Sequence, residues 1–164
     1  MERKEPMTEY GFEKLSKELK YIKEIALPEN AKEIEEARQL GDLKENAEYH
    51  AAREKQQHLM RRESEISDIL SCAVVLDPAK MNHTKVSFGS TVTIVDVDTD
   101  EEFTYTIVGT PESNVDKGLI SFNSPLAKAL LGKEVGDEVE VNLPGGKKTY
   151  EIDSICFEEI CFEN

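Results

Sequence analysis

The sequence contains no tryptophan, only three cysteines and no long apolar run. An odd number of cysteines does not suit a disulfide-stabilised secreted scaffold, so we expect free thiols. No apolar stretch approaches the roughly 18 residues that a membrane-spanning helix requires. The N-terminal stretch MERKEPMTEYG also lacks the apolar core of a secretory signal. These absences predict a cytoplasmic protein that has no membrane partner.

Basic residues are also scarce, because 20 Lys and Arg stand against 34 Asp and Glu, for a formal net charge of −14. General nucleic-acid binders neutralise phosphates with clustered bases, so this balance argues against that class. The deficit is uneven: residues 8–70 carry 15 acids and 11 bases, whereas residues 71–164 carry 17 acids and 7 bases. The mixed charge of the first part is typical of solvated helices.

Residues 8–70 have the periodicity of two amphipathic helices, each with one narrow apolar stripe. The first stripe comprises Phe12, Leu15, Leu19, Ile22 and Ala26, and then Ile34, Ala37 and Leu40 in a new register. The second stripe comprises Leu43, Ala47, Ala51, Leu59, Ile66 and Ile69 or Leu70. Thr8 is the expected first N-cap, and Pro28 should kink or interrupt the first helix. Two such helices predict an antiparallel hairpin with residues Gly41–Asn46 at its tip.

From Lys85 onward the apolar period changes to two, which is typical of strands. Strands are predicted within KVSFGSTVTIVDV, EFTYTIVGT, GLISFN, EVEVNL and TYEIDSICF. SPLAKALLG predicts a short helix with Ser124 as N-cap, Pro125 in its first turn and Gly132 beyond its end. The predicted fold class is therefore α+β, with one helix packed on a mainly antiparallel sheet. The predicted domains are a hairpin at residues 1–75 with an acidic tip near residues 41–46, a linker at 76–84 and a globular domain at 85–164.

Asp42 and Glu45, at the predicted tip, allow two compatible interpretations. In the first, Asp42 is the N-cap of the second helix and Glu45 completes a variant of the capping box. In the second, the two carboxylates lie on one helical face and share a cation. Two carboxylates alone bind Mg²⁺ poorly, because this ion prefers six oxygens in tight geometry. They could, however, complete the shell of an ion that another macromolecule holds.

Arg38 and Arg53 flank the tip on opposite legs of the hairpin. They are either solvated charges or a small basic patch that steers a phosphate backbone. His50 and His58 have no cysteine or HExxH pattern around them, so a zinc site is not expected. No catalytic triad and no phosphate-binding glycine loop is recognisable. We therefore expect that the isolated chain binds no cofactor and has no small-molecule substrate.

Three stretches resemble the Gre family of bacterial transcript cleavage factors: ARQLGDLKENAEYHAAREKQ (37–56), SFGSTVTI (87–94) and LISFNSPLAKALLGKEVGDEVEV (119–141). They occur in that family's order. The acidic charge and the few bases near the tip favour its A-type branch. The resemblance implies an N-terminal antiparallel coiled coil and a C-terminal domain similar to FKBP prolyl isomerases. It also implies that RNA polymerase is the partner, with the coiled coil entering the secondary channel of a backtracked complex.

The resemblance further implies roles for individual residues. Asp42 and Glu45 would support the second Mg²⁺ of the polymerase active site and orient the attacking water. Arg38 and Arg53 would lie near the displaced 3′ end of the nascent RNA. The loop facing polymerase would contain Ser121, Asn123, Ser124 and Pro125. The chain would then be no enzyme itself, but a factor that stimulates hydrolysis by polymerase.

Two other functions stay open. The protein could occupy the secondary channel and modulate or inhibit transcription without stimulating cleavage, although the Asp42–Glu45 pair argues against this. The FKBP-like domain could be a prolyl isomerase. The sequence lacks tryptophan, however, and most aromatic residues after residue 85 lie at strand positions that should pack internally. Similarity of fold does not establish that activity.

Overall fold

The computed structural model describes residues 3–42 and 46–162, which form two compact units. Of the described residues, the hairpin unit contains Arg3 and those of 13–72, and the globular unit contains 4–12 and 73–162. Near the start of the chain, β1 (Glu5–Met7) pairs in parallel with β2 (Ala73–Val75). This small sheet attaches residues 4–12 and 73–75 to the globular unit. Residues 76–84 belong to that unit too, and the predicted bounds of the hairpin, linker and globular domain stay predictions.

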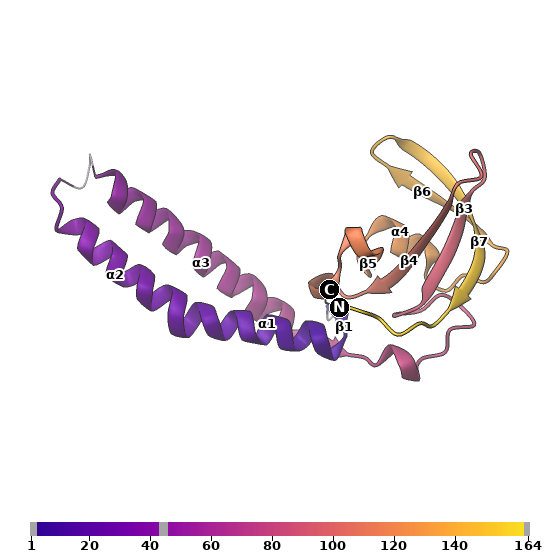
Figure 1. The fold of residues 1–164 in the computed structure, drawn as a ribbon, viewed down its shortest axis with the longest axis horizontal. Coiled ribbons are helices and arrows are strands. Elements are labelled where there is room, and N and C mark those ends of the chain that lie inside the picture. The colour runs from indigo at the N-terminus through magenta and orange to yellow at the C-terminus, as the bar shows by residue number, and fades with distance from the viewer. Residues whose placement is uncertain (1–2, 43–45, 163–164) are drawn as a thin grey trace. The chain divides into compact units, whose positions relative to one another are not determined.

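The hairpin has two legs. One leg comprises α1 (Glu9–Tyr21), the π-helical segment η1 (Ile22–Ala26) and α2 (Leu27–Arg38), and the other is α3 (Ala47–Ser71). Figure 1 shows α2 and α3 running side by side in opposite directions. The predicted N-cap of α1 is confirmed, because Thr8 Oγ1 accepts the Gly11 N–H at 3.2 Å. In the described ranges, no helix has both the length and the apolar character that a membrane crossing needs.

Pro28 lies inside the first leg without ending it. Proline has no N–H to donate to the carbonyl one turn earlier. The expected kink or break takes the form of a π-helical turn, in which the Leu27 N–H bonds to the Ile22 carbonyl, five residues back. The wider turn changes the register of the stripe, so that Ile22, Ala26, Asn30 and Ile34 follow one another at intervals of four and are all buried.

The interface between the legs is more polar than the apolar pattern predicted. Asn30 is fully buried and its Nδ2 donates to the Ala52 carbonyl at 3.0 Å. Ala52 is buried, whereas the predicted Ala51 is exposed. Further differences are that Phe12, Leu40 and Ala47 are exposed, while Leu43 lies outside the described residues. The buried members of the interface are Leu15, Ile22, Ala26, Asn30, Ile34, Ala37, Ala52 and Ile66.

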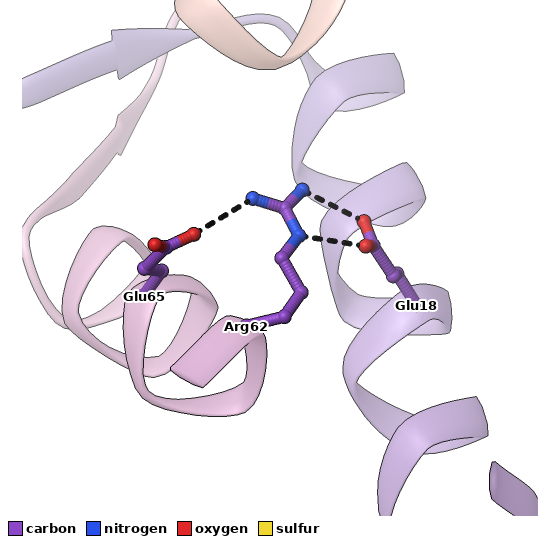
Figure 2. A network of polar contacts seen from close by, with 3 residues as sticks. All are labelled: Glu18, Arg62 and Glu65. Atoms are coloured by element: carbon purple, nitrogen blue, oxygen red, sulfur yellow. Dashed lines mark hydrogen bonds and ion pairs between the residues drawn. The ribbon is translucent and has the colours of Figure 1, made fainter. Parts of the chain in front are cut away.

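An ion pair joins the legs nearer to the open end of the hairpin (Figure 2). Arg62 on α3 binds Glu18 on α1 through two contacts, Nε to Oε1 at 2.7 Å and Nη2 to Oε2 at 3.0 Å. Its Nη1 also lies 3.5 Å from Glu65 Oε2. The hydrogen bond from Arg62 lowers the pKa of Glu18. Since the side chains are 42% and 35% exposed, solvent screens the pair and it mainly fixes how the legs align.

The globular unit contains a five-stranded sheet. Its strands are β3 (Thr91–Asp96), β4 (Glu102–Val108), β5 (Leu119–Ser121), β6 (Glu138–Leu143) and β7 (Gly146–Cys156), in the order β5-β4-β3-β7-β6. All neighbours are antiparallel except β4 and β5, which are parallel. The predicted α+β class is confirmed, with this one parallel pair as a difference. The short helix α4 (Pro125–Leu130) packs its buried Ala127 and Leu130 into the same core as the sheet.

A buried carboxyl anchors the first turn of α1 within the globular unit. Glu112, at the end of the 3₁₀ helix η3 (Thr110–Glu112), is only 3% exposed. Its Oε1 accepts the Thr8 N–H at 2.7 Å and the Gly109 N–H at 3.1 Å. Burial raises the pKa of Glu112, and the two N–H donors oppose this rise. A Cβ at Gly11 would come within 1.8 Å of Glu112 Oε2, so the contact requires glycine there.

Candidate functional site: the tip of the helical hairpin

Asn46, immediately before α3, shapes the tip of the hairpin. Its backbone is extended, with φ −87° and ψ 92°, and its Oδ1 accepts the Tyr49 N–H at 3.0 Å. The His50 N–H bonds to the Asn46 carbonyl at 3.1 Å, which closes the first turn of the helix. Asn46 is therefore the N-cap of α3.

The same side chain also holds the end of α2. Its Nδ2 donates to the backbone carbonyl of Ala37 in the last turn of that helix. The Leu40 N–H bonds to this carbonyl as well, at 3.1 Å. Carbonyls in a last helical turn have no partner in their own helix, so both donors satisfy an otherwise open acceptor. One asparagine amide thus joins the two helix ends that enclose the turn.

Asp42 lies in this turn, and the structure corrects its predicted structural role. The N-cap of the second helix is Asn46, four residues later, so the prediction that Asp42 caps this helix is wrong. The helix begins at Ala47, and Asn46 both caps it and bonds to the carbonyl of Ala37 on the other leg. Asp42 is exposed and follows Gly41, whose φ of 137° favours glycine. Glu45 lies outside the described residues.

The two arginines of the predicted basic patch are on opposite legs, as expected. Arg38 is the last residue of α2, and its guanidinium lies 5.9 Å from the centre of the Tyr49 ring. This cation–π contact links the legs a second time beside the Asn46 cap. Arg53 Nη1 donates to Gln56 Oε1 at 2.8 Å. Because Tyr49 and Arg53 are four residues apart on α3, their side chains project from the same face of that helix.

The described part of the tip does not form a complete metal site. Among the residues the structure describes, no group of three or more His, Cys, Asp or Glu side chains is placed to hold an ion. An exposed carboxylate can nevertheless contribute oxygen to a Mg²⁺ shell, which usually retains waters and includes ligands from a second molecule.

The predicted docking loop follows β5 in the globular unit. Ser121 Oγ lies 2.8 Å from Thr110 Oγ1 and accepts the Asn123 N–H at 3.1 Å. Asn123 Nδ2 donates to Glu5 Oε2 at 3.0 Å, which ties the loop to β1. Ser124 Oγ caps α4 by accepting the Ala127 N–H at 3.2 Å. These contacts give the loop a defined shape.

Exposure divides the predicted docking residues into two kinds. Asn123 and Pro125 are exposed, whereas Ser121 and Ser124 are half-buried. The serines therefore shape the loop through their hydrogen bonds, while Asn123 and Pro125 face the solvent. Sequence reasoning missed Glu5 and Thr110, which support the loop from other elements. They lie far from it in sequence, and no local pattern connects them.

Two family descriptions match the chain in order. One, transcription elongation factor, N-terminal, matches residues 5–75, and the other, transcription elongation factor, GreA/GreB, C-term, matches residues 81–156. Together they cover most of the sequence. The first includes the whole hairpin and the second includes the five-stranded sheet with α4.

Similar proteins cover the full length. The chain is 72% identical over 159 residues to the transcription elongation factor GreA of Nautilia profundicola, covering 97% of this chain and 98% of that one. It is 56% identical over 157 residues to GreA of Aliarcobacter butzleri, covering 96% and 98%. The solved structure of GreA factor homolog 1 (Gfh1) from Thermus thermophilus is 30% identical over 94% of this chain and 99% of that one, with a TM-score of 0.44. From the family matches and the high identity to named relatives, the chain belongs to the GreA/GreB family of transcription elongation factors and is of the GreA type.

Proposed function

We propose that this protein binds RNA polymerase in the cytoplasm and stimulates cleavage of the 3′ end of nascent RNA in backtracked or arrested complexes. The observation that carries the proposal is the position of Asp42: an exposed carboxylate in a turn whose two helix ends are joined by Asn46. Since Asn46 caps the helix, Asp42 is not required as its N-cap. A carboxylate at the end of a two-helix stalk suits insertion into a narrow channel.

In the proposed mechanism, Asp42 and Glu45 would contribute carboxylate oxygens to the shell of a Mg²⁺ ion for which polymerase would supply the other ligands. When bound, the ion neutralises charge that develops on the RNA phosphate. The same carboxylates accept a hydrogen bond from the attacking water and so orient it. A thousandfold stimulation corresponds to about 4 kcal/mol, which is within the range of positioning and charge stabilisation together. Hydrolysis itself belongs to polymerase.

Arg38 and Arg53 have a supporting role in this proposal. Both are exposed cations beside the tip, so they can attract the phosphates of the displaced RNA end. The contact of Arg38 with Tyr49 holds its guanidinium near the start of α3. In the globular unit, the exposed Asn123 and Pro125 would contact the rim of the polymerase secondary channel.

The test uses halted elongation complexes with purified polymerase and Mg²⁺, and it measures short 3′ RNA fragments. Wild-type protein should release these fragments. Asp42→Asn and Glu45→Gln should bind polymerase normally yet release almost none. Glu36→Gln, which removes an exposed charge from α2 near the tip, is the matched control and should cleave like the wild type.

Two results would contradict the proposal. If both tip variants kept full cleavage, the assignment of the carboxylates would be wrong. If the wild type bound polymerase and slowed elongation without shortening the RNA, the protein would instead be a secondary-channel protein that does not stimulate cleavage. Arg38→Ala should bind polymerase with little loss and show a lower cleavage rate, because it removes a phosphate contact and keeps the carboxylates.

A further inference from the structure

The globular unit contains an open apolar groove that the proposed cleavage mechanism does not use. It lies between the first turn of α1, the segment that follows β2, and the C-terminal segment, residues 157–162. Figure 1 shows the yellow C-terminal segment running from the end of β7 back towards β1. The groove has a volume of about 610 Å³, enough for several side chains of another molecule. Its apolar lining includes Tyr10, Val75, Leu76, Pro78, Phe157 and Ile160.

Contacts behind the surface hold the walls of the groove in place. The rings of Tyr10 and Phe162 stack with centroids 4.7 Å apart, which fixes the C-terminal segment against the start of α1. Phe157 stacks on His83 at 5.3 Å. His83 is held in turn, because its Nε2 donates to the Pro78 carbonyl at 2.6 Å and its Nδ1 lies 2.6 Å from Ser90 Oγ. These contacts within the globular unit therefore fix the positions of the side chains that line the groove.

The surface of the groove combines exposed apolar side chains with negative charge. Val75 is 47% exposed and Phe157 is 38% exposed. Of the described residues that line the groove, Glu9, Asp77 and Glu159 are charged and none is basic. Such a surface attracts a segment with apolar side chains flanked by Lys or Arg. It repels anionic lipid and nucleic acid, and it is poorly matched to a second copy of a chain whose net charge is −14.

One wall of the groove lies outside the shared family domains. The family descriptions match residues 5–75 and 81–156, so residues 157–162 extend beyond both. That wall carries Phe157, Glu159, Ile160 and Phe162. The groove therefore combines residues of the matched N-terminal range with residues that follow the matched C-terminal range, and it involves none of the predicted docking residues 121–125.

We propose that this groove is a second docking surface for RNA polymerase and binds a polymerase segment of mixed basic and apolar character. The identity of the partner rests on the proposed function, whereas the chemistry of the segment rests on the groove itself. Binding would bury Val75 and Phe157 and pair Glu159 with a cation of the partner. The groove would add affinity without any part in the chemistry at the tip.

The test compares two double variants of the full-length protein in binding to purified RNA polymerase. Val75→Lys/Glu159→Lys places two cations in the groove. Val135→Lys/Glu140→Lys makes the same change in net charge at an exposed valine and an exposed glutamate elsewhere in the globular unit. The groove variant should bind about tenfold more weakly, and the control should stay within about twofold of the wild type. Circular dichroism should show that both variants fold.

A second measurement leaves the groove nearly unchanged. A benzophenone amino acid at the exposed position Glu159 should crosslink to a polymerase peptide that contains Lys or Arg among apolar residues. Crosslinking to an acidic peptide or to a second copy of this chain would overturn the proposal. The proposal would also fail if the groove variant and the control variant lost the same affinity for polymerase, or if neither lost any. If the wild-type protein itself failed to bind polymerase, the proposed function would fail instead. The binding measurement on the wild type distinguishes that outcome from a failure of the groove proposal.

Discussion

Replacing Asn46 tests how the tip is built. Asn46→Ala removes both the acceptor of the Tyr49 N–H and the donor to the Ala37 carbonyl. Asn46→Asp keeps an acceptor for the helix N-terminus but loses the donor, and it places a negative oxygen near a carbonyl. The alanine variant thus removes both functions of the side chain, and the aspartate variant removes mainly the link between the legs.

The contacts give an expected magnitude. Loss of an N-cap costs about 1 kcal/mol. The hydrogen bond to Ala37 contributes about 1 kcal/mol more, and the carbonyl keeps its bond from the Leu40 N–H at 3.1 Å, so it is not left without a donor. Asn46→Ala should therefore destabilise this end of the hairpin by about 2 kcal/mol. Asn46→Asp should cost about half as much, because a carboxylate at the start of α3 interacts favourably with the helix dipole.

Amide hydrogen exchange of the full-length protein measures this local stability. The Tyr49 amide should exchange about 30-fold faster in Asn46→Ala and about fivefold faster in Asn46→Asp. The amide of Ile66, far along α3, should keep its wild-type rate in both variants. Asp42→Ala is the decisive control, because the sequence pattern predicts Asp42 as the N-cap of the second helix.

The outcomes separate the two assignments. If Asp42→Ala accelerated exchange at Tyr49 while Asn46→Ala did not, the observed capping geometry would be wrong and the prediction from sequence would be correct. If the Tyr49 amide exchanged at the same rate in the wild type, Asn46→Ala and Asp42→Ala, neither side chain would cap the helix. Faster exchange in Asn46→Asp than in Asn46→Ala would contradict the argument from the helix dipole.

Two further predictions concern buried polar groups. Burial raises the pKa of Glu112 above its ordinary value of 4.5. The stabilisation that this side chain contributes is therefore present below pH 4.5 and is lost as the pH rises through the raised pKa. The free energy of unfolding of the wild type relative to Glu112→Gln, measured by urea denaturation, should therefore fall with rising pH in that window; a constant difference would contradict it. Asn30→Asp should destabilise the hairpin by about 3 kcal/mol at neutral pH, because it places a charge beside the Ala52 carbonyl in the interface, and acid should restore part of the loss. Thermal denaturation followed by circular dichroism measures this effect, and a variant as stable as the wild type would place the side chain outside the interface.

Most of the fold could be predicted because its signals are local. The helical and strand periodicities reflect the need to bury apolar side chains, and they located both legs of the hairpin and the strands of the sheet. The Ser124 cap and the turn at Gly132 are set by neighbouring residues, so α4 was predicted within one residue of its observed ends. Strand pairing is not local, and the parallel contact of β4 with β5 was missed.

The interface between the legs shows where apolar patterns mislead. The apolar pattern omits Asn30 because it is polar, yet Asn30 is fully buried and donates a hydrogen bond to the Ala52 carbonyl. The predicted stripe includes Ala51 in place of Ala52, although a strict heptad fits the sequence. Ala52, Leu59 and Ile66 are each seven residues apart, and this signal would have found the observed register.

The amino-acid sequence by itself determined the two-part α+β architecture, the hairpin with its acidic turn and membership of the family, because each depends on residues that are close together or on long matching stretches. Only the tertiary structure decided which residue caps the second helix. Asp42 and Asn46 are both residue types that cap helices well, and the Ala37 carbonyl decides between them. Folding of the hairpin brings this carbonyl within hydrogen-bond reach of the Asn46 amide. The apolar groove was likewise invisible in the sequence, since its walls come from the beginning, the middle and the end of the chain and meet only when the globular unit folds.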